Sequence, residues 1–125
     1  MDKAKLLQIN RLRRRARVRA RVSGTALKPR LNVARSLYGV FVQLIDDTAG
    51  KTILSLHSKT LSKVKLDDVG ERKGKVALSY ITGRKLAEMA LEKKIAEAVF
   101  DRSSYKYHGR ISAVAEGARA GGLKF

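Results

Sequence analysis

The sequence predicts an α/β protein. We expect a mixed sheet, built from an antiparallel meander of three strands and a parallel fourth strand, flanked by helices and preceded by a basic helical arm. Three observations predict this class. The first 30 residues carry 11 of the 28 Lys and Arg side chains. Short apolar runs with short connections follow, as in antiparallel strands. Two helical patterns then enclose one more apolar run, which favours a parallel crossover.

The arm is predicted for residues 1–28 and the globular body for residues 29–125. The periodicity of apolar residues in the arm is ambiguous. Alternation of small apolar residues between positions 16 and 22 is typical of a strand, whereas Leu6, Leu7, Ile9 and Leu12 suit a helix. We favour a helix that ends at Ser23-Gly24, followed by a linker that contains Lys28-Pro29.

Three strands are expected next. Leu31 and Val33 alternate with less apolar neighbours, and residues 40–45 form a nearly continuous apolar run, as in a central strand. Residues 46–50, Asp-Asp-Thr-Ala-Gly, are strong turn formers. Residues 52–56 form the third predicted strand. The short connections favour an antiparallel meander.

The second half of the body alternates helix and strand. Residues 58–75 are polar and rich in Lys, which indicates a mobile loop. A helix is predicted from about Lys75 to Lys93, where Gly83 would weaken the helix but permit close packing. Residues 95–100 form a short apolar strand that Asp101 should end. Apolar positions 111, 114, 115 and 118 predict a last helix over residues 109–120, terminated by Gly121-Gly122.

The net charge of +17 requires an explanation, because a free-standing domain gains little from such self-repulsion. A polyanion explains it, with nucleic acid as the first candidate and an anionic membrane surface as the second. Arginine grips phosphates with two donors and stacks on unpaired bases, so the arm is expected to form or extend its helix on RNA. The alternative to RNA binding is that the arginines form a charged face exposed to solvent. The small residues between the arginines disfavour a membrane helix.

Residues 101–110, Asp-Arg-Ser-Ser-Tyr-Lys-Tyr-His-Gly-Arg, are the second candidate site. Aromatic rings there could stack on exposed bases while cations hold phosphates. Backbone N–H groups at the following helix start could bind an anion. The alternative, that one Tyr packs on the sheet and His108 caps the helix, is equally compatible with the composition.

Catalysis is the disfavoured reading. Asp46, Asp47 and Asp101 lie at predicted strand ends, as carboxylates of metal-dependent nucleases do, and His57 or His108 could act as a base. However, the Asp pair precedes Gly50 in a turn pattern, and no catalytic motif or cysteine is present. No apolar run reaches the roughly 20 residues of a membrane span, and the start does not resemble a signal peptide, so an intracellular protein is expected.

The last 27 residues then resemble a known family. Val99-Phe100-Asp101-Arg102, Tyr105, Tyr107-His108-Gly109-Arg110, Ala113, Ala115, Ala118-Arg119 and Gly122-Leu123-Lys124-Phe125 are similar to the carboxyl end of the bacterial large ribosomal subunit protein eighteen family. Pro29-Arg30-Leu31, Val33, Arg35-Ser36, Gln43, Ile45-Asp46-Asp47 and Gly50 resemble its strand region. Ser103 stands where the family usually has Gly, so this turn is expected to differ locally, and residues 58–75 match poorly.

The resemblance implies a ribonuclease-H-like fold without nuclease activity, in a structural constituent of the cytoplasmic ribosome. The implied partners are 5S rRNA, 23S rRNA and another 5S rRNA-binding ribosomal protein, meeting in the central protuberance. No cofactor, metal, membrane or small-molecule substrate is implied. The family's RNA contacts correspond here to Arg11, Arg13, Arg14, Arg15, Arg17, Arg19, Arg21, Arg30, Arg35, Ser36, Arg102, Tyr105, Tyr107, His108 and Arg110.

Overall fold

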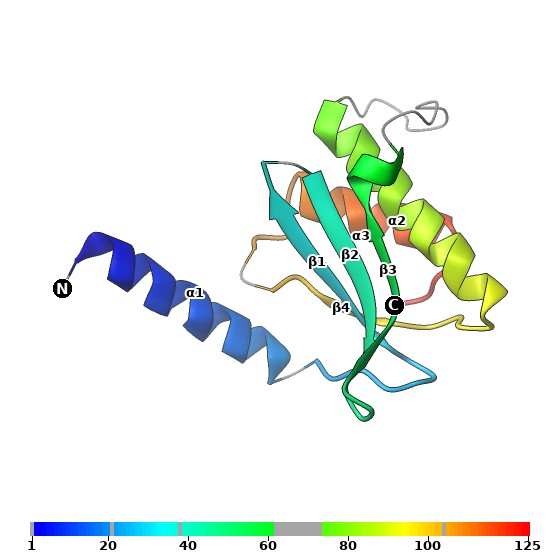
Figure 1. Ribbon diagram of the computed structural model, residues 1–125, viewed down its shortest axis with the longest axis horizontal. Coiled ribbons are helices and arrows are strands. Elements are labelled where there is room, and N and C mark those ends of the chain that lie inside the picture. The colour runs from blue at the N-terminus through cyan, green and yellow to red at the C-terminus, as the bar shows by residue number, and fades with distance from the viewer. Residues whose placement is uncertain (1, 21, 38, 62–73, 104) are drawn as a thin grey trace.

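The order of helices and strands is the predicted one, with one short helix added. A computed structural model describes residues 2–20, 22–37, 39–61, 74–103 and 105–125 (Figure 1). The elements are α1 (Lys3–Arg19), β1 (Arg30–Ser36), β2 (Gly39–Asp46), β3 (Lys51–His57), the 3₁₀ helix η1 (Ser58–Leu61), α2 (Gly74–Glu92), β4 (Val99–Asp101) and α3 (Arg110–Ala120). The α/β class is therefore confirmed.

The sheet confirms the predicted meander and the predicted parallel strand. Its order is β3-β2-β1-β4, with β1 antiparallel to β2 and β2 antiparallel to β3. The last strand, β4, runs parallel to β1, and Leu31 lies opposite Phe100. The first and the last strand of the body are thus neighbours in the sheet.

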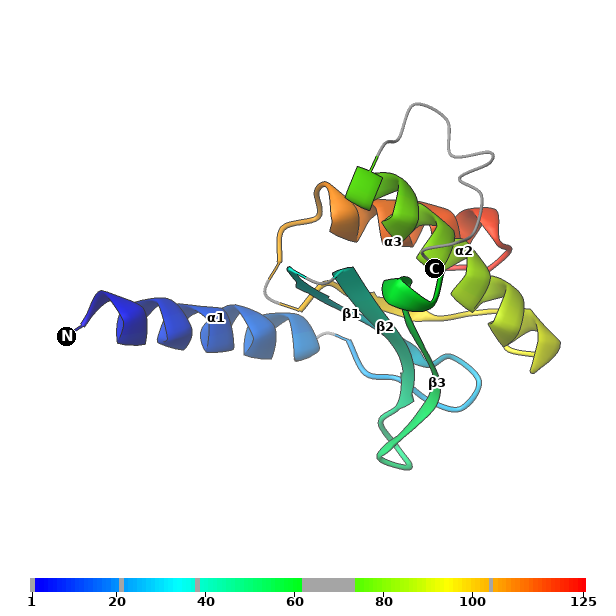
Figure 2. The same cartoon turned by 45° about the horizontal axis from the view of Figure 1, so that its top comes forward.

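The core explains why burial alternates along β2, although its sequence is almost continuously apolar. Helices α2 and α3 cover one face of the sheet (Figure 2). Val40, Val42 and Leu44 point to that face and are fully buried, whereas the residues between them are partly exposed. The predicted central position of this strand is confirmed, because β2 lies between β3 and β1, and its outer face is partly exposed because helices cover only the other face.

Two glycines bring α2 and α3 into close contact. A Cβ atom at Gly83 would lie 2.2 Å from the carbonyl oxygen of Val114, and one at Gly117 would lie 1.9 Å from that of Tyr80. Any larger side chain would therefore push the helices apart. The close packing predicted for Gly83 is confirmed, and Gly117 provides its counterpart on α3.

The fourth strand is shorter than predicted. Only residues 99–101 pair with β1, and Asp101 is part of the strand. Ile95 and Ala98 are buried in the core but are not part of β4. The chain there is held by the N–H of Ala98, which donates to the carbonyl of Lys124 at 2.9 Å, and by an isolated bridge between Glu97 and Lys124. Because Ile95 and Ala98 are buried, this extended segment contains apolar residues as a strand does, although it does not pair with the sheet.

The segment 58–75 is only partly what was expected. Residues 58–61 form η1 rather than loop, with Ser58 and Leu61 buried, and α2 already begins at Gly74. The remaining residues of the predicted mobile loop, 62–73, lie outside the described residues.

The arm is one helix that ends earlier than predicted. The carboxylate of Asp2 accepts a hydrogen bond from the N–H of Ala4 at the start of α1, and no residue of α1 is buried. The helix ends at Arg19, four residues before Ser23. Gly24 is instead fixed to the β2–β3 turn, because its N–H donates to Asp47 Oδ2 at 2.7 Å and its carbonyl accepts from the N–H of Asp47 at 3.0 Å.

Candidate nucleic-acid interface

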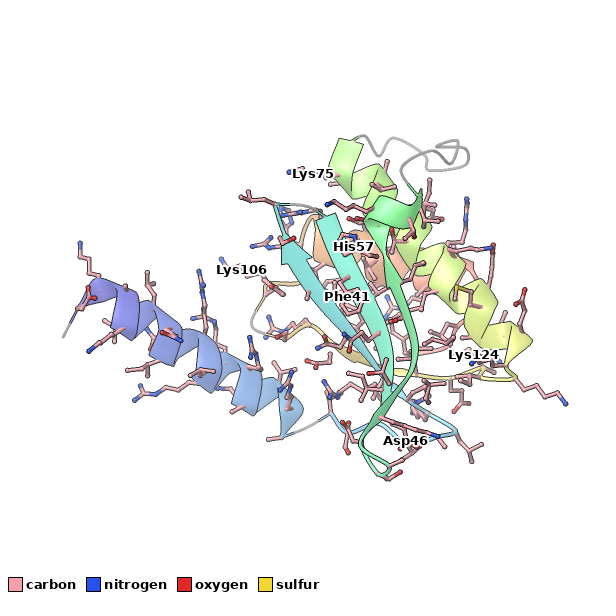
Figure 3. The ribbon with its side chains drawn as sticks, viewed as in Figure 1. Phe41, Asp46, His57, Lys75, Lys106 and Lys124 are labelled. Atoms are coloured by element: carbon pink, nitrogen blue, oxygen red, sulfur yellow. The ribbon has the colours of Figure 1, made fainter. Side chains whose placement is uncertain are left out.

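A basic cleft of about 810 Å³ lies between α1 and the loop that connects β4 to α3. It is lined by Arg11, Arg14, Arg15, Arg35, Arg102, Tyr105, Lys106, His108 and Gly109. Six of these nine residues carry a positive charge, and none of them is acidic. Lys106 belongs to the loop on the side of the body nearer to α1 (Figure 3). The structure therefore brings the two predicted sites together in one cavity.

The helical periodicity of α1 sorts its arginines into two groups. Arg11, Arg14 and Arg15 are spaced i, i+3 and i+4, so they share one face, and all three line the cleft. Arg13 and Arg17 are exposed and do not line it. Arg21 lies outside the described residues. The arm therefore presents arginines in two directions, of which only one faces the loop.

Arg15 has an unusual environment for an arginine of an exposed arm. Among the side-chain atoms that the structure describes, its Nε is the one buried nitrogen or oxygen without a hydrogen-bond partner. A charged donor without an acceptor is unfavourable, so an incoming acceptor would stabilise it.

Tyr105 is held against the end of β1. Its hydroxyl donates to the carbonyl of Arg35 and accepts from the N–H of Arg35, each at 3.4 Å. The guanidinium of Arg35 lies 4.9 Å from the centre of the ring, within the range of a cation–π contact. Arg102 Nη1 donates to the carbonyl of Tyr105 at 3.1 Å. The ring is therefore oriented by the protein before any ligand binds.

The other loop residues serve two roles. Arg110 Nη1 donates to the carbonyl of Ser36 at 3.0 Å, which ties the start of α3 to the end of β1. Tyr107 packs edge-on against Phe100, with ring centroids 5.9 Å apart, yet it remains 47% exposed. His108 is exposed at the cleft. The packing considered as the alternative for one tyrosine is seen at Tyr105, which is half-buried against the core and also lines the cleft, while Tyr107 has its edge contact with Phe100.

Asp101 lies under both the arm and the loop. Its buried carboxylate accepts from Arg30 Nη1 at 2.6 Å, from the Asn32 side chain at 3.0 Å and from the N–H of Ser103 at 2.8 Å. Arg19 Nε lies 3.7 Å away. Burial alone would raise the pKa of Asp101, but the hydrogen bonds from Asn32, Ser103 and Arg30 outweigh it and leave this pKa lowered. Asp101 therefore remains charged and organises its surroundings.

Arg30 is placed by this network in the interior rather than at a ligand. It is 8% exposed, and its guanidinium also donates to both carboxylate oxygens of Asp47 at 3.0 Å. The hydrogen bond to Asp47 raises the pKa of Arg30, and burial opposes this only in part. Because its donors are committed to two carboxylates, we assign Arg30 to the framework of the site.

The residues considered for catalysis have structural partners. The carboxylate of Asp46 accepts hydrogen bonds from Thr48, which lower its pKa and form the predicted turn. His57 Nδ1 accepts from the N–H of Lys59 at 3.0 Å, and its ring lies against Phe41 on the sheet (Figure 3). No three metal-binding side chains gather among the residues that the structure describes. None of the helices described there is long and apolar enough to cross a bilayer.

Sequence reasoning missed the network around Asp101 and the orientation of Arg15. One signal was available for Asp101, since it is an acid between an apolar strand and a basic loop, where ion pairing is common. Ser103 adopts φ 57°, a conformation that favours glycine, which agrees with the Gly expected there from the family resemblance.

The fold and the cleft define a basic α/β protein of the nucleic-acid-binding class. The family model described as ribosomal L18 of archaea, bacteria, mitochondria and chloroplast matches residues 5–125. The chain therefore belongs to the ribosomal protein L18 family. It is accordingly a structural, RNA-binding component of the large ribosomal subunit and not an enzyme.

Individual relatives agree with this assignment. The large ribosomal subunit protein uL18 of Staphylococcus haemolyticus is 48% identical over 115 residues, 92% of each chain. The protein of the same name from Alkaliphilus oremlandii is 49% identical over 116 residues, 93% of each chain. That of Streptococcus suis is 44% identical over 124 residues, which are 99% of this chain and 93% of the relative. The similarity thus includes both the arm and the body.

Proposed function

We propose that this protein binds 5S rRNA and helps to attach it to 23S rRNA in the central protuberance of the large subunit. The observation that carries the proposal is the cleft, in which six cations and two aromatic rings from the arm, β1 and the 102–109 loop converge. Such a combination suits folded RNA, which offers phosphates and unpaired bases at fixed positions. The resemblance of this chain to the large-subunit protein eighteen family, which implies 5S rRNA as a partner, supports the choice of RNA.

The proposed division of labour follows from exposure. Residues 1–28 act as an RNA-binding arm on the body of residues 29–125. The arm, β1 and the loop contribute contacts with RNA through Arg11, Arg13, Arg14, Arg15, Arg17, Arg19, Arg21, Arg35, Ser36, Arg102, Tyr105, Tyr107, His108 and Arg110, of which those that line the cleft contact 5S rRNA. The arginines that point away from the cleft are available to 23S rRNA. A second 5S rRNA-binding ribosomal protein completes the assembly.

Competition binding tests this function. Labelled 5S rRNA is titrated with the protein at physiological salt, against unlabelled 5S rRNA, tRNA or random RNA of equal length. Unlabelled 5S rRNA should compete at least tenfold better than the others, because sequence-independent phosphate contacts do not discriminate. Equal competition by all three RNAs would indicate a generic basic RNA-binding or nucleoid protein. The bridging role is tested by capture of 23S rRNA fragments. The complex of the protein with 5S rRNA should capture them, whereas the protein alone and 5S rRNA alone should not.

A further inference from the structure

We propose that the cleft between α1 and the 102–109 loop receives a single unpaired nucleotide, with its phosphate at Arg15 and its base at Tyr105. This inference rests on the proposed function and makes it more specific, since it states which part of the RNA the arm and loop hold between them. The ligand class is an anionic nucleotide with a free base face, and paired RNA is excluded from the cleft.

The dimensions of the cleft favour one nucleotide. Protein cavities of about 300–1,000 Å³ enclose ligands of roughly nucleotide size, and this cleft has about 810 Å³. In a duplex, each base is stacked between its neighbours and offers no face to a side chain. A nucleotide that lies outside the stack can enter, while the flanking strand follows the basic rim.

The donors of Arg15 require an anion. Its Nε is buried without an acceptor, whereas Arg11 and Arg14 on the same helix face line the cleft with it. The described lining residues include no carboxylate that could serve as the acceptor. A phosphate is the anion that RNA supplies, and arginine binds it through two parallel hydrogen bonds.

Tyr105 supplies the place for the base. Its hydroxyl is fixed by the backbone of Arg35, and the Arg35 guanidinium lies over the ring at 4.9 Å. Two planar groups are thus held together at the wall of the cleft, and both stack on nucleobases. Because the ring is already oriented, little side-chain freedom is lost when a base binds.

The two groups of arm arginines provide a matched experiment. Arg15→Gln and Arg13→Gln each remove one charge from α1, but only Arg15 lines the cleft. The full-length variants and Tyr105→Ala are bound to 5S rRNA, and the unpaired bases of the RNA are probed by chemical modification. Equal thermal transitions confirm that each variant is folded.

We expect the wild-type protein and Arg13→Gln to protect one unpaired base that is reactive in free 5S rRNA. Arg15→Gln and Tyr105→Ala should leave this base reactive at saturating protein. Loss of stacking in Tyr105→Ala should weaken binding by about 5- to 150-fold. Arg15→Gln should weaken binding at least five times more than Arg13→Gln does.

Two results would overturn the proposal: no unpaired base is protected, or the two arginine variants behave alike. Either result leaves the 5S selectivity of the wild-type protein intact, so the proposed function is judged separately. Conversely, if the wild-type protein does not select 5S rRNA, protection of one unpaired base in tRNA, lost in Arg15→Gln but not in Arg13→Gln, would still support the cleft as a nucleotide site.

Discussion

At the scale of residues, the carboxylate of Asp101 controls the geometry of the interface. It is fully buried and holds Arg30 and Asn32 of β1 and the backbone of Ser103 in the loop. Removing one member of a buried ion pair leaves the other charge without compensation, which typically costs about 3–5 kcal/mol. The orientation of the loop, and through Arg19 that of the arm, therefore depends on a side chain that is fully buried.

We predict that Asp101→Asn lowers the free energy of unfolding by about 3 kcal/mol at pH 7. The same variant should flatten the acid dependence of stability. The pKa values of Asp101 and Asp47 are lowered in the folded protein, and an unfolded Asp titrates near pH 3.9. Their stabilisation is therefore complete above about pH 5 and is lost as the pH falls below about 4, through the folded pKa values.

Urea unfolding between pH 7 and pH 2 measures both effects. Glu88→Gln is the control, because Glu88 is exposed on α2 and should change neither the stability nor its pH dependence. If Asp101→Asn were as stable as the wild-type protein, or lost stability in acid just as steeply, the assigned role of this carboxylate would be wrong.

The pair formed by Arg30 and Asp101 shows what the sequence could not predict at this scale. The two residues are 71 positions apart, and nothing local in either segment indicates the other. The family resemblance placed Arg30 among the expected RNA contacts, and its partners in the interior could not be predicted. The exposed arginines and Tyr105 could be proposed from composition, since a dense run of cations and aromatic residues in a loop is visible without knowledge of contacts.

At the scale of elements, the contact between α2 and α3 is controlled by Gly83 and Gly117. Helix propensity alone predicts that Gly117→Ala would stabilise an exposed helix by about 1 kcal/mol. We predict the opposite sign, a loss of about 3 kcal/mol or more, because the new methyl group would meet the carbonyl oxygen of Tyr80 and the helix backbones would have to separate.

Thermal and urea unfolding decide the sign of this effect. Ala120→Gly, at the exposed end of α3, is the matched control and should cost no more than about 1 kcal/mol. A neutral or stabilising Gly117→Ala would mean that the two helices are less closely packed than the structure indicates.

Periodicity predicted most of the elements, and its failures have physical causes. The alternation in β1 and the helical spacing in α2 and α3 reflect the face that each element buries, so they could be read directly. Ile95 and Ala98 are equally apolar and buried, but they belong to the extended connection from α2 to β4, in which Ala96 and Glu97 are exposed. Likewise, the contact between Gly24 and Asp47 joins residues 23 positions apart, so local patterns do not contain it.

At the scale of the whole molecule, we propose that the arm and the body are two parts with different roles. Helix α1 contributes no buried residue, and it extends away from the two-layer body (Figure 2). Gly24 and Arg30, which both contact Asp47, follow α1 in the chain, so these contacts do not involve the arm helix. The uneven distribution of charge along the chain is the basis for proposing this division, whereas the direction in which the arm points required the structure.

We predict that deletion of residues 1–22 leaves a body that unfolds cooperatively near the temperature of the full chain. Its affinity for RNA should fall sharply, because the arm's phosphate contacts are lost. The slope of log affinity against log salt should decrease by about 0.7–0.9 for each lost contact. Thermal scans and salt titrations measure these quantities, and the residual binding should still favour 5S rRNA.

Two outcomes would contradict this division of the molecule. Loss of the cooperative transition would show that α1 is part of the fold, with the contact between Arg19 and Asp101 as the first suspect. An unchanged salt slope would show that the arm lies away from the RNA.

The pairing of β1 with β4 also sets an order of events during synthesis. The body closes only when its last residues are available, because Leu123 is buried and Phe125 stacks on Phe100 at 5.6 Å. The arm is translated first, and a helix of its length forms in about a microsecond. At roughly 5–20 residues per second, Asp101 follows Arg19 by on the order of ten seconds. For that interval the nascent chain contains a cationic helix without the 102–109 loop that completes its cleft, so an RNA that meets it can contact the arm but not the assembled cleft.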